Sequence, residues 1–522
     1  MLKWSVRTLQ TTKLACTLSA LAAPASCGGA ANTPLSLPVL SITTTSLPDG
    51  MVAFQYSQTI QSSGGGAPLA WTVNSGNLAH NLNLGTGSTN PANISGIPDT
   101  AQAATFTIQV KDAKNQTAVQ RYTLNISSTG LVQLQPVPGK GLPGTIEIQG
   151  VSAGPFHPLS WQQDTLNWVP DARMPMFAAQ TTGHYRNIYA PWPLEQANGW
   201  RMFYGGWDGQ DVPFDEIRST ATSDFLTFGP RDLIIGYGEF LNVNNVNVQQ
   251  LPDGSLHMIC TGGQAANIDN FPLYFSSPDG ATWNGTVEPY SARLTDIINL
   301  QGYAGFGTGD FNGANVLLRD NETWALYFKD WNDFHNIYRA TADTLPNFRM
   351  QGVALRSDHA VNDVKKFLVD GTNWYLMGLH FNDQSLFYSL SNDGITFSPE
   401  QKLFSHLSSQ DFNMVALGFV VKGGQLLGVL YGADAGASDG SLTDNQIFAR
   451  WLQKKVVITD SSGAQYTLQG GYGPDRQSFK PPSSGSLKGI ITVYAEDGIT
   501  PLGTGTVTVS AGQAYQLVVG GG

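Results

Sequence analysis

Apolar and polar residues alternate over much of the chain, in short runs that end in turns rich in Gly, Pro, Asn and Asp. Examples are residues 104–110 (Ala-Thr-Phe-Thr-Ile-Gln-Val) and 489–494 (Gly-Ile-Ile-Thr-Val-Tyr). A period of two places successive side chains on opposite faces of a strand, so these runs predict half-buried β-strands. No long segment has the 3.6-residue period of an amphipathic helix. We therefore predict an all-β protein.

A longer repeat begins after residue 150. A turn followed by an aromatic or aliphatic strand occurs five times, at intervals of roughly 50 to 70 residues, the length of one four-stranded propeller blade. The five copies are 198–204, 253–258, 321–328, 370–376 and 423–429. Such units bury little surface alone, and a closed ring of them leaves no exposed sheet edge. The repeat predicts a five-bladed β-propeller.

A polar turn recurs between the outer strands of four of these units, at 223–228, 277–283, 341–348 and 391–397. In two of them, Asp279 and Asp393 precede a glycine and, four residues on, an aromatic residue. An Asp carboxylate in such a turn caps backbone N–H groups, and glycine adopts the left-handed conformation. We predict that these aspartates stabilise the fold and take no part in chemistry.

These patterns divide the chain into five segments. We interpret residues 1–27 as a signal peptide, 28–38 as a linker, 39–128 as an Ig-like β-sandwich, 129–458 as the five-bladed β-propeller and 459–522 as a small C-terminal β-domain. Closure of the ring predicts a borrowed strand. Residues 145–149, which alternate and lie before the first blade, are the candidate to pair with the last one.

Composition narrows the class of partner. The chain has 522 residues, of which 58 are Gly, 28 are Pro and only 13% are charged, and this suits many short strands joined by tight turns. A formal net charge of −11 and a pI near 5.1 leave no basic surface for a phosphate backbone or an anionic membrane. We predict a neutral carbohydrate as the partner, exclude nucleic acid, and expect a monomer.

The first 27 residues have the pattern of an export signal. Three basic residues precede and flank the apolar run 14–23, which is too short to span a bilayer. Two processing sites compete: cleavage after Ala25, or a lipobox that ends at Cys27 and places a lipid anchor there. The protein is predicted to be either an outer-membrane or cell-surface lipoprotein, with that anchor as its membrane contact, or a secreted protein.

Three cysteines, one of them inside the signal, predict neither a disulfide framework nor a cysteine metal cluster. Cys260 lies in the apolar stretch 256–260, and we expect it to be a small buried core residue.

Chemistry in a propeller is expected where the inner strands of all blades converge. Asparagine recurs on those predicted strands, and a carboxylate lies upstream of each of them: Asp171, Glu239, Asp310, Asp358 and Asp411. Aromatic faces stack on sugar CH groups, while amides and carboxylates bind hydroxyl groups. We interpret as substrate-binding candidates Trp192, Asn247, Asn315, His359 and Asp411. For each acid the alternative is a structural one, the capping of a strand end.

The five-fold repeat, the Ser-x-Asp-Gly turns, and residues 188–191 ahead of 199–204 resemble five-bladed glycoside hydrolases of the arabinanase, xylosidase and invertase kind. The resemblance covers the propeller only. It implies a base Asp in the first blade with a supporting Asp and an acid Glu from later blades, and the catalytic candidates are then Asp171, Asp310 and Glu239. Asp171-Ala172 departs from the family's Asp-Pro pattern, and the chain has no Glu-Gly-Pro segment.

The resemblance implies inverting hydrolysis of a neutral polysaccharide or oligosaccharide, with paired carboxyl groups about 6.5 to 9.5 Å apart. A non-catalytic glycan-binding or adhesive surface protein is the alternative, and the sequence leaves both open. Such glycosidases can hold a central cation near a histidine, which leaves calcium open at His359, although no histidine spacing marks a metal site. In the N-terminal segment, residues 47–50, 56–59, 64–71 and 97–100 resemble a bacterial Ig-like family, which implies a spacer or adhesive module.

Overall fold

The computed structural model describes residues 39–522 apart from 53–55, 86–90, 129, 140, 162–164, 264–269, 288, 314, 436–443, 468–469 and 521–522. The regular secondary structure of these residues is β-strand, apart from one short α-helix, α1 (Pro158–Trp161), and one 3₁₀ turn, η1 (Leu294–Asp296). The all-β prediction is confirmed. None of the described helices is long and apolar enough to cross a membrane. The chain divides into two compact units, one made of most residues up to Ile126 and the other of Ser127 onward.

The first unit contains two sheets with buried apolar faces. One has the order β2 (Gly50–Met51), β9 (Thr117–Ser127), β8 (Gln102–Lys111) and β5 (Ala70–Gly76); the other has β3 (Tyr56–Ile60), β7 (Ala92–Gly96) and β6 (Leu82–Gly85), while β1 (Ser41–Ile42) pairs with β4 (Ser62–Ser63). Alternate residues of β8 are buried, among them Phe106, Ile108 and Val110, as the period of two predicted. Membership of the Ig-like family stays a prediction.

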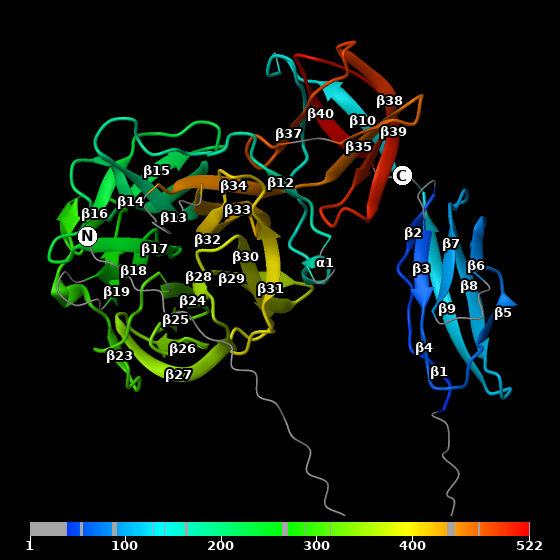
Figure 1. Ribbon diagram of the computed structural model, residues 1–522, viewed down its shortest axis with the longest axis horizontal. Coiled ribbons are helices and arrows are strands. Elements are labelled where there is room, and N and C mark those ends of the chain that lie inside the picture. Colours follow the sequence, from blue (N-terminus) through cyan, green and yellow to red (C-terminus); the bar gives the residue numbers. More distant parts are fainter. Residues whose placement is uncertain are drawn as a thin grey trace, which may run out of the picture. The chain divides into compact units, whose positions relative to one another are not determined.

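The second unit contains five mainly antiparallel sheets arranged around a common centre (Figure 1). The first is β13 (Tyr185–Gln196), β14 (Gly199–Gln210), β15 (Glu216–Thr222), β16 (Asp232–Gly236) and β22 (Tyr290–Ser291); the second is β17 (Asn242–Gln250), β18 (Leu256–Gly263) and β19 (Asn270–Ser277). The third is β24 (Asn315–Asp320), β25 (Thr323–Lys329), β26 (Asn336–Ala342), β27 (Asn347–Arg356) and β23 (Asn299–Gln301). The fourth is β28 (Ala360–Val369), β29 (Thr372–His380), β30 (Ser385–Ser391) and β31 (Gln401–Ser405), and the fifth is β32 (Asn413–Lys422), β33 (Gln425–Asp434), β34 (Gln446–Leu452) and β12 (Trp168–Pro170).

The inner strands of these sheets form a closed ring. β13 contacts β17, and the contacts continue through β24 and β28 to β32, which again contacts β13. Apolar side chains of neighbouring sheets pack together between them, as Phe203 of the first does with Val246 and Met258 of the second. Each repeated segment found in the sequence forms the second strand of its sheet, and the segment before it forms the inner strand.

The fifth sheet takes its outer strand from residues that precede the first blade. β12 pairs with β34, with Val169 opposite Trp451, so the ring is closed by a borrowed strand. The sequence predicted such a strand but identified the wrong segment. Residues Ile146–Gln149 form β11, which pairs with β37 (Arg476–Phe479) and β40 (Gln513–Gly520). The reason is burial, because Ile146 and Ile148 enter the core of that other sheet.

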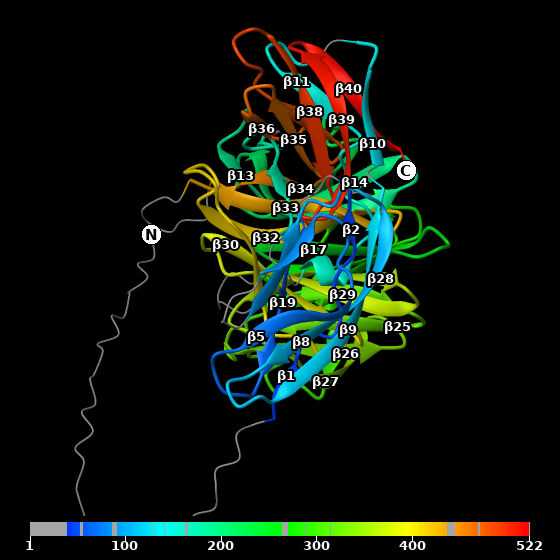
Figure 2. The same ribbon diagram turned by 90° about the vertical axis from the view of Figure 1, so that its right-hand side faces the viewer.

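An eight-stranded sheet lies next to the last blade in both views (Figures 1 and 2). Its order is β36 (Gln465–Thr467), β35 (Lys455–Asp460), β38 (Ser486–Tyr494), β39 (Pro501–Ser510), β10 (Gly130–Pro136), β40, β11 and β37. The C-terminal domain is therefore built from both sides of the propeller sequence. This corrects the predicted boundaries 129–458 and 459–522, since the propeller sheets extend from Trp168 to Leu452.

The outer turns have the predicted structure. Asp279 Oδ1 accepts hydrogen bonds from the N–H groups of Ala281 (2.9 Å) and Thr282 (2.7 Å), and Gly280 has a φ of 78°. The turn at Asp393 has the same bonds. These carboxylates are occupied by the backbone, which confirms their structural role.

Candidate functional site

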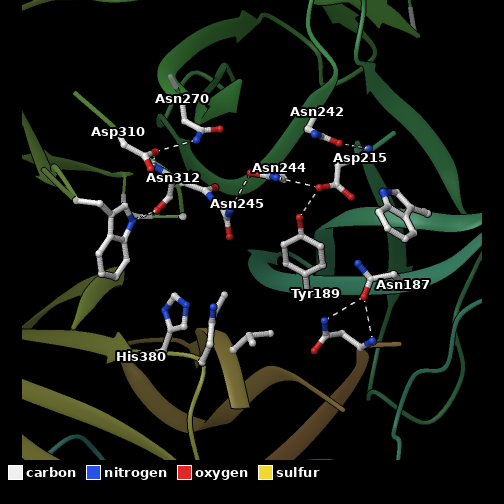
Figure 3. Close-up of a pocket in the computed structure, with 17 residues that line it drawn as sticks. Asn187, Tyr189, Asp215, Asn242, Asn244, Asn245, Asn270, Asp310, Asn312 and His380 are labelled. Carbon is white, nitrogen blue, oxygen red and sulfur yellow. Dashed lines mark hydrogen bonds between the residues drawn. The ribbon is translucent and has the colours of Figure 1, made fainter. Parts of the chain in front are cut away.

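A polar pocket of about 450 Å³ is lined by residues near the starts of the inner strands β13, β17 and β32 and by residues just before β24 (Figure 3). Its lining is dominated by amide side chains: Asn187, Asn242, Asn244, Asn245, Asn270, Asn312, Asn382 and Asn445. Two carboxylates, Asp215 and Asp310, also line it, together with Tyr189, Trp207, Trp331 and His380. Within the described part of the chain, no Lys or Arg lines this pocket. It is therefore a hydrogen-bonding cavity without a cationic side chain.

Irregular pairing shapes the inner strands at the floor of the pocket. The register shifts in four of them: β13, β17, β28 and β32. At three of these points Ala190, Asn245 and Ala416 have φ values of 50°, 54° and 27°. A β-bulge bends a strand and redirects its side chains. Asn244 and Asn245 can therefore both line the cavity, although neighbours on a regular strand point to opposite faces.

Asp215 lies in the loop before β15 and is buried. Its Oδ2 accepts hydrogen bonds from the hydroxyl of Tyr189 (2.5 Å) and the amide of Asn244 (2.9 Å). Oδ1 has no hydrogen-bond partner among the described residues, and the Trp207 N–H is near without forming a bond of ordinary geometry. Burial raises the pKa of Asp215, and the neighbouring donors oppose that rise. This carboxyl is therefore easier to protonate than an exposed aspartate.

Asp310 lies on another part of the pocket wall, with Asn244 and Asn245 between it and Asp215 in the view of Figure 3. The amide of Asn270 donates to its Oδ1 at 2.8 Å, and its backbone N–H donates to buried Asp330 at 3.0 Å. The two pocket carboxylates thus differ in environment, one buried and the other partly exposed.

His380, at the end of β29, is the pocket's histidine. Its Nδ1 lies 2.6 Å from Oδ1 of Asn362. Burial lowers the pKa of His380 to about 4, so the ring is neutral at pH 7. No group of three or more His, Cys, Asp or Glu side chains that could hold a metal ion occurs among the described residues.

Asp171, the predicted base, does not reach the pocket. Its carboxylate is buried and bonded to the Arg173 guanidinium (2.8 Å to each oxygen), to Trp451 Nε1 (2.9 Å) and to the N–H of Gly473 (3.2 Å). These bonds join the last blade to the segment between β36 and β37. The prediction was wrong because the Asp171 carboxylate is ion-paired with Arg173 and accepts hydrogen bonds from two further donors, which gives it a structural role. The position of Asp171 in the sequence does not reveal these partners.

Glu239, Asp411 and His359 also lie outside the pocket lining. Glu239 is exposed and accepts the N–H of Leu294 at 2.7 Å. Asp411 is fully buried and caps the N–H groups of Leu407 and Ser408. Nδ1 of His359 lies 2.9 Å from Oε1 of Glu400. For Glu239 and Asp411 the structure therefore favours the capping alternative, and His359 is a hydrogen-bonded histidine outside the pocket lining.

Trp192, Asn247 and Asn315 are buried on inner strands and lie outside the pocket lining. Trp192 donates to the carbonyl of Val248, Asn247 accepts the N–H of Leu317, and Asn315 donates to the carbonyl of Phe311. They bond neighbouring blades or turns to each other, and none lines the pocket. Cys27 lies outside the described residues. Cys260 is buried on β18 and free, as expected.

Of the predicted catalytic residues, the structure brings only Asp310 to the pocket, and its role stays a prediction. Sequence reasoning missed Asp215, because it belongs to the loop before the third strand of its blade, whereas the repeat pattern pointed to residues at the inner strands. The signal that could have found it is the carboxylate that ends the Val-Pro-Phe-Asp loop after Trp207. The recurrence of asparagine was the more useful indicator of the pocket.

No family model and no curated protein match the chain. Solved structures similar to it include a glycosyl hydrolase from Bacteroides ovatus (9% identity, 62% of this chain and 99% of that one, TM-score 0.43) and a family 32 β-fructofuranosidase from Bombyx mori (10%, 68% and 94%, 0.38). An endo-arabinase from Bacteroides thetaiotaomicron matches with 12% identity over 52% of this chain and 96% of its own, at a TM-score of 0.34. These three structures are described as a glycosyl hydrolase, a β-fructofuranosidase and an endo-arabinase. At such scores they give no basis for assigning an activity.

Proposed function

We propose that the propeller binds a neutral glycan in its polar pocket. The observation that carries this proposal is the lining, in which eight asparagines and two tryptophans surround a cavity without Lys or Arg among the described residues. An amide both donates and accepts hydrogen bonds, as a sugar hydroxyl requires, and an indole face stacks on sugar CH groups. The volume lies within the ~300–1,000 Å³ of small-molecule sites.

Calorimetric titration of the mature protein with neutral and acidic polysaccharides tests this proposal. We expect binding to a neutral glycan, and a loss of at least about tenfold in affinity for Trp331→Ala, because a central aromatic contact dominates such interfaces. Trp374→Ala is the matched control, since Trp374 is partly buried against the core of the fourth and fifth sheets and outside the pocket. Preference for an acidic polysaccharide, or equal losses in both variants, contradicts the proposal.

Hydrolysis is the second candidate function, favoured by two carboxylates of different environment in one pocket. Asp215, whose pKa burial raises, is the candidate general acid that protonates the leaving glycosidic oxygen. Asp310 is the candidate base that takes a proton from water as the water oxygen attacks the anomeric carbon. The products are two shorter sugars, one of which carries the new hydroxyl on an inverted anomeric carbon, while the other leaves with the protonated oxygen.

Product analysis separates the two functions. If hydrolysis occurs, wild type releases reducing ends, while Asp215→Asn and Asp310→Asn abolish release and retain binding. Asp171→Asn retains release in the folded protein, because Asp171 lies away from the pocket. Binding without any release by wild type excludes hydrolysis and leaves glycan binding in place.

We also propose that the protein is exported, on the basis of the N-terminal pattern of basic, apolar and small residues. Labelling with a radioactive fatty acid distinguishes the two forms. Incorporation that Cys27→Ala removes supports the lipoprotein, and an unlabelled mature chain beginning after Ala25 supports secretion.

A further inference from the structure

Three aromatic side chains form a cluster at the edge of the pocket, which we call the aromatic shelf: Trp331, Phe334 and Phe381. The ring centres of Trp331 lie 5.8 Å from Phe334 and 5.9 Å from Phe381, and those of the two phenylalanines lie 5.7 Å apart. Trp331 lines the pocket, while Phe334 and Phe381 are 37% and 41% exposed. The shelf therefore continues the pocket wall outward across the third and fourth blades.

A buried lysine stabilises the loop that carries Trp331 and Phe334. Lys329 Nζ donates to the carbonyls of Phe334 (2.5 Å) and Ser357 (2.8 Å), and lies 5.3 Å from the ring centres of both Trp331 and Phe334. Both distances are within cation–π range. The ammonium thus fixes the loop and its two rings together.

Hydrogen bonds of Asp330 and Trp331 connect the same loop to the pocket wall. Asp330 Oδ1 accepts the N–H groups of Asp310 (3.0 Å) and Asn332 (2.9 Å), and Trp331 Nε1 donates to the carbonyl of Asn312 (2.7 Å). A surface ordered before binding loses little conformational entropy when a ligand arrives. Exposed aromatic rings on a loop ordered by these hydrogen bonds are suited to binding a ligand.

We propose that the ligand is a glycan chain of several sugars, with one sugar in the pocket and the next ones stacked on the aromatic shelf. This rests on the proposed function, because the shelf adjoins the pocket through Trp331. Sugar rings present flat CH faces that fit separate aromatic rings one by one. Three side chains are too few for a stable interface with a second protein, which buries about 800 Å² on each partner.

Titration of the full mature chain with arabino-, xylo-, galacto- and manno-oligosaccharides of one, two, four and six sugars tests the proposal. For the series that binds, we expect wild-type affinity to rise about tenfold or more from one sugar to four. Phe381→Ala should remove most of that gain and leave the monosaccharide affinity unchanged, while Phe381→Trp restores it. Trp331→Ala should weaken the binding of both the monosaccharide and the tetrasaccharide. Because Phe381 is largely exposed, its variants should fold, and a thermal melt checks this.

Equal affinity for one and four sugars would overturn the proposed role of the aromatic shelf in binding and would leave the proposal for the pocket unaffected. A Phe381→Ala variant that binds tetrasaccharide as well as wild type also overturns that role of the shelf. If no probe of any length binds, both proposals fail together. Concentration-dependent dimerisation in sedimentation that Phe381→Ala abolishes assigns the shelf to a second copy of the chain and overturns the glycan role.

Discussion

The hydroxyl of Tyr189 donates to Oδ2 of Asp215 at 2.5 Å, and this bond links the inner strand of the first blade to the loop before β15. Asn244, from the next blade, donates to the same oxygen. One pocket carboxylate is thus held by residues of two blades. Its pKa reflects the balance between burial, which raises it, and these donors, which lower it.

Tyr189→Phe is expected to raise the pKa of Asp215 further, because it removes a hydrogen bond that stabilises the ionised form. Carboxyl carbon NMR of the labelled protein measures the midpoint. Tyr274→Phe, which removes a hydroxyl bonded to His257 on the second blade, is the control and should not move it. An unchanged Asp215 midpoint in Tyr189→Phe would show that the hydrogen bond from Tyr189 does not stabilise the ionised form of Asp215.

Asp171→Ala is expected to lower the free energy of unfolding by about 3–5 kcal/mol, because it leaves the Arg173 guanidinium and other donors without their buried partner. Glycan affinity of the folded variant should stay at the wild-type level. Denaturant unfolding and calorimetry measure the two quantities. Glu239→Ala, at an exposed site, is the control with little effect on either. A stable variant that loses binding would return Asp171 to a functional role.

The buried His380 predicts a loss of stability in mild acid. Its folded pKa of about 4 lies below its unfolded value of 6.5, so the unfolded state binds more protons between these pH values. Stability attributable to His380 therefore falls as pH drops from about 6.5 to 4, by up to about 3 kcal/mol. His380→Gln should flatten that part of the stability curve. The exposed His184→Gln should leave it unchanged, and equal curves for wild type and His380→Gln would contradict the prediction.

Lys329→Met is expected to destabilise the protein by about 1–3 kcal/mol, because the carbonyls of Phe334 and Ser357 lose their donor. It should also weaken tetrasaccharide binding, since Trp331 and Phe334 lose their support. Lys454→Met is the matched control: its ammonium donates to Ser152 away from the pocket, so stability should fall without a change in affinity. Equal affinities for the two variants would limit Lys329 to a structural role.

Local patterns in the sequence were sufficient for the repeated strands of the propeller and for its outer turns. The turn around Asp279 and Gly280 depends on residues within four positions of each other, and the five repeated segments form the second strands of five sheets. Alternation also located the buried residues of β8. These features depend on short-range hydrogen bonding and on which side of a strand is buried, and both are present in the order of residues.

Tertiary structure alone decided which side chains meet. Asp171 and Asp310 both precede a blade, yet one is locked to Arg173 and Trp451 and the other reaches the pocket. Asp215 reaches the pocket from a loop, where it bonds to Tyr189. The strand β11 does not pair with a propeller strand; it pairs with β37, more than 300 residues away in the sequence. Such pairings depend on the packing of distant segments, on bulges that redirect inner-strand residues, and on competition for buried apolar partners. The sequence determined an all-β propeller, and the packing decided where its chemistry can lie.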